Sequence, residues 1–408
     1  MAGVDPPVDT EFGLSRAVVD VLGLLAALSG GLLSARAEAQ PVPGMPEPGE
    51  PTPPPAGAAT SPTEIQAERP DPDQRDGPGP GWVILPGINY APEPGLTVAA
   101  SLLRYFRVGD DPDGRLSSHR LSASVSFKGR GELSYDPHFW AADDRLHLTT
   151  TLNANYFDYP YYGIGNDTRA EDREDFTAVR VHARPEAAAR VWGDFFAGVL
   201  YDFRYEHMTE VEEGGMIDAG VVGAEGGVLS GVGGILRWDS RDHSFSPRRG
   251  GVVSFSPRMY RRGLGSDHDF GRLLVDGSWF VGLGGEHVVA VDGRADFRTG
   301  APPFDHLSLA GGSRLLRGMI EGRYRDNHYL AGQVEYRFPL FWRVGGVAFG
   351  GSGRVADRLR QFNLNDWHWA AGGGVRFAVN RDERINLRLD AGATAEGPNF
   401  YLAIGEAF

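Results

Sequence analysis

The residues that could do chemistry are scattered along the chain without a catalytic pattern. Among the histidines, His243, His268, His306 and His368 lie at predicted loop and strand positions without the spacing of a metal site. No G-x-S-x-G, P-loop or H-E-x-x-H sequence occurs. Acidic pairs such as Asp143-Asp144 fall in predicted turns, where carboxylates usually face solvent. We therefore expect no enzyme activity, no cofactor and no metal site.

Other charged residues alternate with apolar ones, and this alternation predicts their surroundings. In segment 289–297, valines and other apolar residues oppose Asp292, Arg294 and Asp296. Segments 120–128, 195–206 and 367–379 alternate in the same way, the last with Arg376 on its polar face. Side chains of a strand point to alternate sides, so each segment predicts a β-strand with one apolar and one hydrated face.

The length of these strands favours a transmembrane barrel over a soluble sandwich. The apolar faces span 9–13 residues, close to the roughly 9–11 residues that a tilted strand needs to cross a bilayer. Aromatic residues gather at the predicted strand ends, as in the interfacial girdles of outer-membrane barrels. The fold class predicted is all-β, an antiparallel transmembrane barrel of about 16 strands over residues 82–408. The strands are expected to begin near residues 83, 95, 119, 131, 145, 175, 193, 228, 250, 270, 287, 328, 344, 367, 384 and 399.

Composition excludes several other classes of protein. The chain has 57 Gly, no Cys and a net charge of −14. The absence of Cys rules out disulfides and thiolate metal sites, and the acidic balance argues against a nucleic-acid partner. Mean hydropathy is negative and no run of 18 apolar residues occurs, so a helical membrane protein is not expected.

The first 81 residues are expected to lie outside the barrel. Residues 21–33 form a short apolar run, and the small residues Ala35, Ala37 and Ala39 follow it. This pattern predicts a signal peptide over residues 1–39, although Asp5, Asp9 and other acids precede the run. Residues 41–80 hold 13 Pro and 5 Gly and no aromatic residue. We expect residues 40–81 to be a Pro-rich disordered periplasmic linker.

The last predicted strand ends in aromatic and aliphatic residues. Phe400, Leu402, Ile404 and Phe408 are expected on one face, which Glu406 interrupts. A terminal Phe on such a strand resembles the recognition signal of outer-membrane barrels. The alternative is an ordinary closing strand.

Four motifs, in order and spacing, resemble the bacterial surface antigen superfamily of BamA/TamA-like outer-membrane barrels. The first is Pro160 to Asn166. The second is a strand-turn-strand motif over 237–251, "D-x-R-D-x-x-x-x-P-x-x-G", in which the matching residues are Asp239, Arg241, Asp242, Pro247 and Gly250. The third is the loop-tip motif Leu316-Arg317-Gly318-Met319, and the fourth is the strand 330–340 that follows it.

The resemblance implies sixteen strands and a long loop folded into the lumen, with Arg317 reaching an acidic residue on the barrel wall. The alternation places Glu335 on the polar face of its strand, so we expect an Arg317–Glu335 contact. The alternative is an arginine in a solvated loop. The sequence departs from the family at Met319, where an aromatic residue is usual, and at Gly351, where an acidic residue is common.

The function implied by the resemblance is insertion or translocation of protein or lipid at the outer membrane of a Gram-negative bacterium. Family members of this kind carry periplasmic POTRA domains, and no such domain fits the 40 Pro-rich residues before the barrel. The expected partners are outer-membrane lipid, a separate periplasmic protein that supplies substrate, and the barrel assembly machinery for the chain's own insertion. The alternatives are a narrow or plugged passive pore, and a structural or partner-binding barrel.

Overall fold

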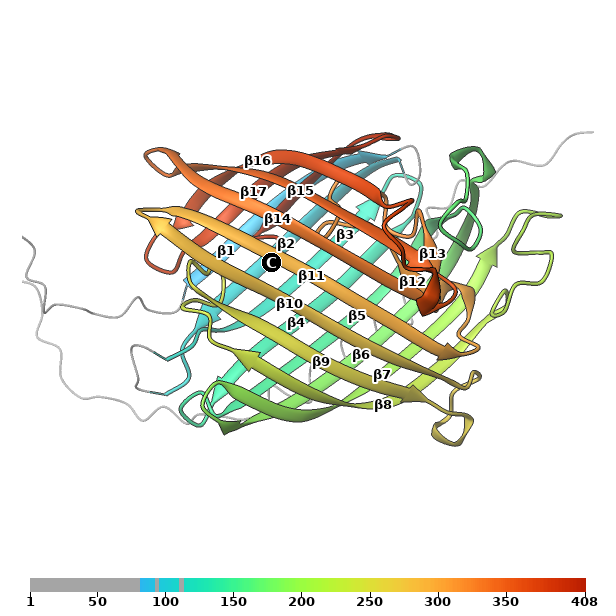
Figure 1. The fold of residues 1–408 in the computed structure, drawn as a ribbon, viewed down its shortest axis with the longest axis horizontal. Coiled ribbons are helices and arrows are strands. Elements are labelled where there is room, and N and C mark those ends of the chain that lie inside the picture. The colour runs from blue at the N-terminus through green and yellow to red at the C-terminus, as the bar shows by residue number, and fades with distance from the viewer. Residues whose placement is uncertain (1–80, 92–94, 110–113) are drawn as a thin grey trace, which may run out of the picture. The chain divides into compact units, whose positions relative to one another are not determined.

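The computed structural model describes residues 81–91, 95–109 and 114–408. The predicted signal peptide and nearly all of the predicted linker lie outside these residues. Within them, sixteen antiparallel strands follow one another around a single sheet in chain order (Figure 1). The strands of this sheet are β1 (Gly81–Ala91), β2 (Gly95–Phe106), β3 (Ser117–Ser126), β4 (Gly131–Ala141), β5 (Leu146–Tyr161), β6 (Glu174–Trp192), β7 (Phe195–Glu210), β8 (Gly226–Asp239), β9 (Gly250–Tyr260), β10 (Phe270–Gly284), β11 (His287–Gly300), β14 (His328–Phe341), β15 (Val344–Ala356), β16 (His368–Asn380), β17 (Ile385–Thr394) and β18 (Gly397–Ile404).

The predicted strand count is therefore confirmed, and each strand begins within two residues of its predicted start. Alternation explains this agreement. On β14, Gln333 and Glu335 are buried while Val334 and Tyr336 are 51% and 39% exposed. Charged groups inside and apolar groups outside are the reverse of a soluble protein, and they fit a barrel whose outer wall faces lipid.

The four longest connections between strands lie at one end of the barrel, and several of the shortest turns lie at the other. Loops 162–173, 211–225, 301–327 and 357–367 lie at one end, whereas the turns 193–194, 285–286 and 342–343 lie at the opposite end. Because outer-membrane barrels have short periplasmic turns and longer outer loops, we call the first end external and the second periplasmic. Residues 405–408 follow β18 at the periplasmic end.

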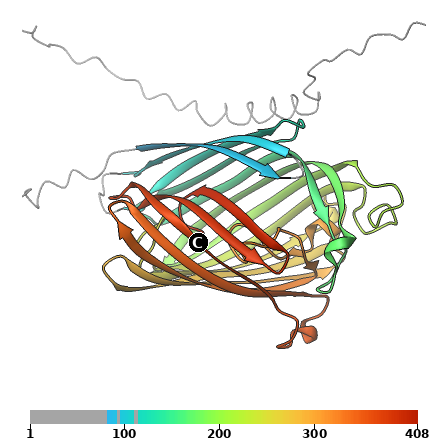
Figure 2. The same cartoon turned by 90° about the horizontal axis from the view of Figure 1, so that it is seen from above.

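The first and last strands meet at a seam that carries no backbone pairing among the described residues. Figure 2 shows the red C-terminal strands returning toward the blue N-terminal strands. Side chains close the periplasmic end of this seam: Val83 of β1 and Ile404 of β18 are buried in one apolar cluster with Leu103 and Ile385. Near them, Arg107 donates to both carboxylate oxygens of Glu383 at 2.7 and 3.3 Å.

Three prolines within strands interrupt the pairing elsewhere. The register skips Pro137 between β4 and β5, Pro185 between β6 and β7, and Pro257 between β8 and β9. Proline has no N–H to donate to the ladder, so a skip at each position is expected. Thr150 pairs with Pro185, and Tyr201 pairs with Val232, so these skips follow one line across neighbouring strands.

No helix among the described residues is long and apolar enough to span a membrane. The only helices described there are short 3-10 turns in loops: η1 (Ala170–Asp172), η2 (Arg262–Leu264), η3 (Phe304–His306) and η4 (Leu359–Gln361).

Candidate functional site

The candidate site is the 301–327 loop, which folds back into the lumen of the barrel. Within the loop, the short strands β12 (Ser308–Leu309) and β13 (Arg325–Asp326) pair with each other, and Arg325 bridges to Gly165 of the neighbouring 162–173 loop. Figure 1 shows β12 and β13 at the external end. The buried contacts of residues 315–319 with the inner wall, described next, confirm the predicted lumen-inserted loop.

An apolar cluster anchors the middle of the loop to the wall. Leu315, Leu316 and Met319 are buried against Tyr329, Ala331, Val355 and Ala370 of strands β14, β15 and β16. Met319, which stands where the family usually has an aromatic residue, therefore lies in this cluster. Met is flexible and fills irregular gaps, so it can serve as an anchor at this position.

Arg317 is the most deeply placed charge of the loop. Its side chain is fully buried, and its guanidinium lies 3.6 Å above the ring centre of Phe349 on β15. One terminal nitrogen, Nη2, donates to Glu335 of β14, and the other, Nη1, donates to Asp390 of β17 at 2.6 Å. The structure thus places Arg317 against Glu335, the residue named from the sequence.

Asp390 is the residue that sequence reasoning missed. The family pattern leads one to look for a second carboxylate at Gly351 of β15, and Gly351 has none. Asp390 supplies it from a strand two positions further around the wall. Its alternation with apolar neighbours in β17 indicated a lumen-facing carboxylate, but it did not indicate the partner.

The loop backbone packs directly onto the wall beside Arg317. Gly318 has φ +114°, a conformation that glycine adopts readily. Its N–H donates to the Tyr401 hydroxyl at 3.0 Å, and its carbonyl accepts from Asn399 at 2.7 Å, both on β18. A Cβ on Gly392 would lie 2.1 Å from the Arg317 carbonyl oxygen. We call Arg317, Gly318, Glu335, Asp390 and Gly392 the latch.

Further arginines neutralise the carboxylates of the latch. Arg337 donates to Glu335 at 2.7 Å, and Arg376 donates to Asp390 at 2.5 Å. Arg376 also donates to Glu406 at 2.7 Å. Buried charges are tolerated when they are paired and hydrogen-bonded, so this network is compatible with a lumen largely closed to water.

A second loop arginine, Arg314, holds the loop to another part of the wall. It donates to Asp276 of β10 at 2.6 Å and to Asp292 of β11 at 2.8 Å. Burial alone would lower the pKa of Arg314, but Asp292 and Asp276 outweigh burial and raise it. Asp292 was expected to line the lumen, and its pairing with Arg314 was not foreseen.

The strand-turn motif lies at the periplasmic end, apart from the latch. Asp239 ends β8 and is buried, and Arg241 donates to both of its carboxylate oxygens at 2.9 Å. Asp242 accepts from the backbone N–H groups of Arg248 and Arg249 at 2.8 and 3.0 Å. Burial alone would raise the pKa of Asp242, but Arg384 and these N–H groups lower it.

The remaining motif residues shape the turn itself. Gly250 opens β9 with φ +83°, and a Cβ there would lie 2.1 Å from the Ser240 carbonyl oxygen. Pro247 offers its carbonyl to Arg337 at 3.5 Å, which joins the turn to the arginine that pairs with Glu335. The motif therefore builds a rigid periplasmic turn.

The prediction for the last strand was wrong in part. Phe400 and Leu402 are exposed on the outer face, but Ile404 is buried in the seam cluster. Strand β18 ends at Ile404, and Phe408 lies near Phe280 with ring centres 6.2 Å apart. The reason is local: Gly405, at φ +90°, turns the chain away from the strand, and Glu406 bonds Arg376 and Asn386.

Comparisons with known proteins identify the family. The Omp85 superfamily domain matches residues 114–408. Among solved structures, BamA from Haemophilus ducreyi lacking POTRA domains 1-3 aligns at 15% identity and TM-score 0.49, over 79% of this chain and 69% of that one. CdiB from Acinetobacter baumannii aligns at 10% identity and TM-score 0.49, over 78% of this chain and 57% of that one. No curated protein sequence matched.

The family match covers fourteen of the sixteen barrel strands, from β3 to β18, together with the latch and the strand-turn motif. The resemblance predicted from the motifs is thereby confirmed, and the chain belongs to the Omp85 superfamily as a barrel of the outer membrane.

Proposed function

We propose that this barrel inserts or translocates protein or lipid at the outer membrane. The observation that carries the proposal is the seam between β1 and β18. Every other neighbouring pair of strands in the sheet is joined by backbone pairing, and among the described residues this one is not. An unpaired backbone group in the hydrocarbon layer costs several kcal/mol.

In a passive pore or a structural barrel, unpaired backbone groups at the seam would serve no function, because full pairing of β1 with β18 would remove their energetic cost. A barrel that admits a strand or a lipid between its first and last strands needs an edge that opens. The periplasmic end of the seam is held by side chains, Val83 and Ile404 among them, which can separate without breaking a ladder.

The latch connects the lumen loop to the same edge. Gly318 bonds Tyr401 and Asn399 of β18, the strand at the seam, and Arg317 bonds Asp390 of β17. A movement of the loop therefore changes the support of the two last strands. This coupling favours a barrel whose plug and seam act together.

The partners we propose are outer-membrane lipid, a separate periplasmic protein that delivers substrate, and the barrel assembly machinery that inserts this chain. We also propose that the barrel catalyses no covalent chemistry. A Gram-negative source and a cleaved signal peptide belong to the same proposal, and N-terminal sequencing of the mature protein tests the cleavage.

A disulfide across the seam tests the function. The chain has no Cys, so Val83→Cys/Ile404→Cys introduces a single pair. The purified barrel is reconstituted in phospholipid vesicles, and the folding of a small outer-membrane protein diluted from urea is followed. Flipping of a fluorescent phospholipid is measured in parallel. We expect wild type to accelerate one of the two processes, and the oxidised pair to abolish the acceleration until it is reduced.

The matched control is Ser101→Cys/Ser122→Cys, which joins the paired strands β2 and β3 at residues whose hydroxyls lie 2.7 Å apart. This variant should remain active when oxidised. Acceleration that survives the oxidised Val83–Ile404 bridge would exclude the seam as the route. A wild type that accelerates neither process would favour the alternative of a plugged passive pore, for which the filled lumen is the supporting observation.

A further inference from the structure

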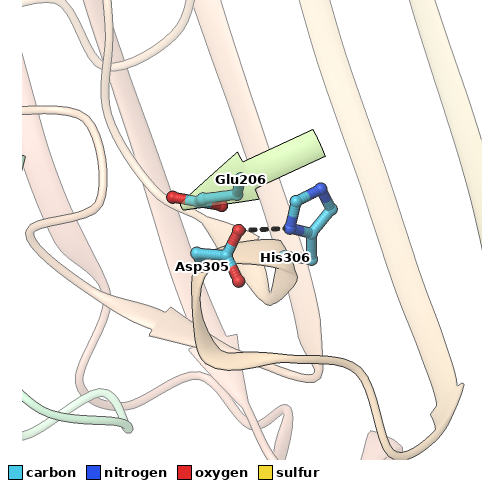
Figure 3. Close-up of side chains that lie close together, drawn as sticks. All are labelled: Glu206, Asp305 and His306. Carbon is cyan, nitrogen blue, oxygen red and sulfur yellow. Dashed lines mark hydrogen bonds and ion pairs between the residues drawn. The ribbon is translucent and has the colours of Figure 1, made fainter. Parts of the chain in front are cut away.

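A cluster outside the latch brings together three side chains that ligate metals. Glu206 comes from β7 of the wall, and Asp305 and His306 come from η3 of the lumen loop (Figure 3). One oxygen of each carboxylate and one imidazole nitrogen all lie within 4.8 Å of one another. These three residues also line a cavity of about 270 Å³ in the external half of the lumen.

The loop turn that presents two of the ligands is held firmly. Phe304 is buried with Tyr161, Phe176 and Ile217, and its N–H donates to Val222 at 2.8 Å. The His306 carbonyl accepts from Arg298 at 2.5 Å. A site on a fixed turn loses little conformational entropy when it binds an ion.

The cluster brings the carboxylates of Glu206 and Asp305 close together. Arg180 donates to Glu206 at 2.5 Å and so pairs with the first of the two carboxylates. The Asp305 side chain is only 5% exposed, and its Oδ2 lies 2.5 Å from His306 Nδ1. Among the described residues, no arginine or lysine forms an ion pair with Asp305. Arg180 and Arg325 offset part of the charge of Asp305 from further away. Two buried carboxylates this close still repel each other unless a proton or a metal ion lies between them, so a bound cation would stabilise the pair.

The imidazole of His306 already lies against a carboxylate of the cluster. Its Nδ1 bonds Asp305, and among the described residues its buried Nε2 has no hydrogen-bond partner. One imidazole with two carboxylates is a donor set that suits Zn²⁺, with a fourth position left for water from the cavity.

We infer that Glu206, Asp305 and His306 bind one Zn²⁺ ion, which clips the lumen loop to strand β7. The ion would take the place of the Asp305–His306 hydrogen bond and draw the Glu206 oxygen closer. The site is separate from the latch, which holds the loop to β14 and β17. It does not depend on what the barrel transports.

Zinc binding to the full chain tests the site. The protein is purified without a polyhistidine tag, folded in detergent, and titrated with Zn²⁺ by calorimetry, with the bound metal counted by mass spectrometry. We expect one equivalent in wild type. Asp305→Asn and His306→Leu should each weaken binding at least tenfold, whereas Glu321→Gln, which lines the same cavity outside the cluster, should not change it.

Unheated gel mobility verifies that each variant remains a folded barrel, so a loss of binding reports the site. X-ray absorption at the zinc edge should show nitrogen and oxygen neighbours at about 2.0–2.2 Å and, because the chain has no Cys, no sulfur from cysteine. A wild type without stoichiometric zinc, or folded Asp305→Asn and His306→Leu variants that bind as tightly as wild type, would overturn the inference.

Discussion

Arg317 and Asp390 lie 73 residues apart in the sequence and meet as a 2.6 Å ion pair with both side chains fully buried. Glu335 occupies the other terminal nitrogen of the arginine. The tip of the lumen loop is therefore tied to two strands, β14 and β17, by one guanidinium. The pairing makes Arg317 the residue whose removal should release the loop.

Replacing Arg317 with Ala should lower the free energy of unfolding by about 3 kcal/mol, because it leaves two buried carboxylates with one arginine fewer. Urea titration of the folded barrel in lipid or detergent measures this loss. The control is Arg358→Ala, since Arg358 is exposed and its single ion pair among the described residues is with its neighbour Asp357. If Arg317→Ala lowered the free energy of unfolding no more than the control does, the latch would contribute no stability.

Deletion of residues 301–327 should open the lumen. In planar bilayers we expect wild type to be almost silent and the deletion variant to carry large, steady currents. A variant lacking residues 262–265, the exposed η2 turn of another external loop, should behave as wild type. Equal large currents from all three proteins would show that the loop does not block the barrel.

Gly392→Ala should displace the loop without removing any charge. The new Cβ would lie 2.1 Å from the Arg317 carbonyl oxygen, so the backbone contact must open, at a cost of about 1–3 kcal/mol. Faster cleavage of the loop by a protease added from outside would report the displacement. Gly350→Ala is the matched control, because its Cβ would meet nothing closer than 4.0 Å. Identical cleavage of both variants would contradict the packing described here.

The periplasmic turn should lose stability as the pH falls from 6.5 to 4. Burial, with a contribution from Arg384, lowers the pKa of His243 from 6.5 to about 4. Its neutral Nδ1 accepts the N–H groups of Phe245 and Ser246 at 3.1 and 3.3 Å. Because the folded pKa lies below the unfolded one, the contribution is complete above pH 6.5 and declines toward pH 4, by up to about 3 kcal/mol.

Urea titration at pH 7.5, 6, 5 and 4 measures this decline. His243→Asn keeps an acceptor but does not titrate, so it should remove the part of the pH dependence that is due to His243. A wild type and a His243→Asn variant with the same slope over this range would show that His243 is not responsible.

Alternation of side chains was enough to predict the strands, because lipid outside and charge inside impose a period of two along each of them. It also placed Glu335 on the lumen face, and the loop-tip motif then named Arg317 as its partner. Asp390 could not be named in the same way. Alternation assigns a face to each strand, but which lumen residues meet depends on the curvature of the wall and the path of the loop.

At the end of the chain, alternation predicted a common face that the structure does not show for all four residues. Phe400, Leu402, Ile404 and Phe408 continue one apolar period in the sequence, but Gly405 allows a turn that the period does not reveal. Glu406 then gains bonds to Arg376 and Asn386. Contacts between distant segments decided the position of these last residues, as they decided the meeting of Glu206 with Asp305 and His306.

The skipped pairs at Pro137, Pro185 and Pro257 have a mechanical consequence. A barrel whose neighbouring strands are all fully paired resists a change of its cross-section equally at every strand. This one has missing bonds along a line through β4 to β9, while the seam lies between β1 and β18. Fewer backbone bonds join neighbouring strands in this part of the wall, so we expect it to accommodate a change of cross-section more readily than the fully paired strands if the seam opens.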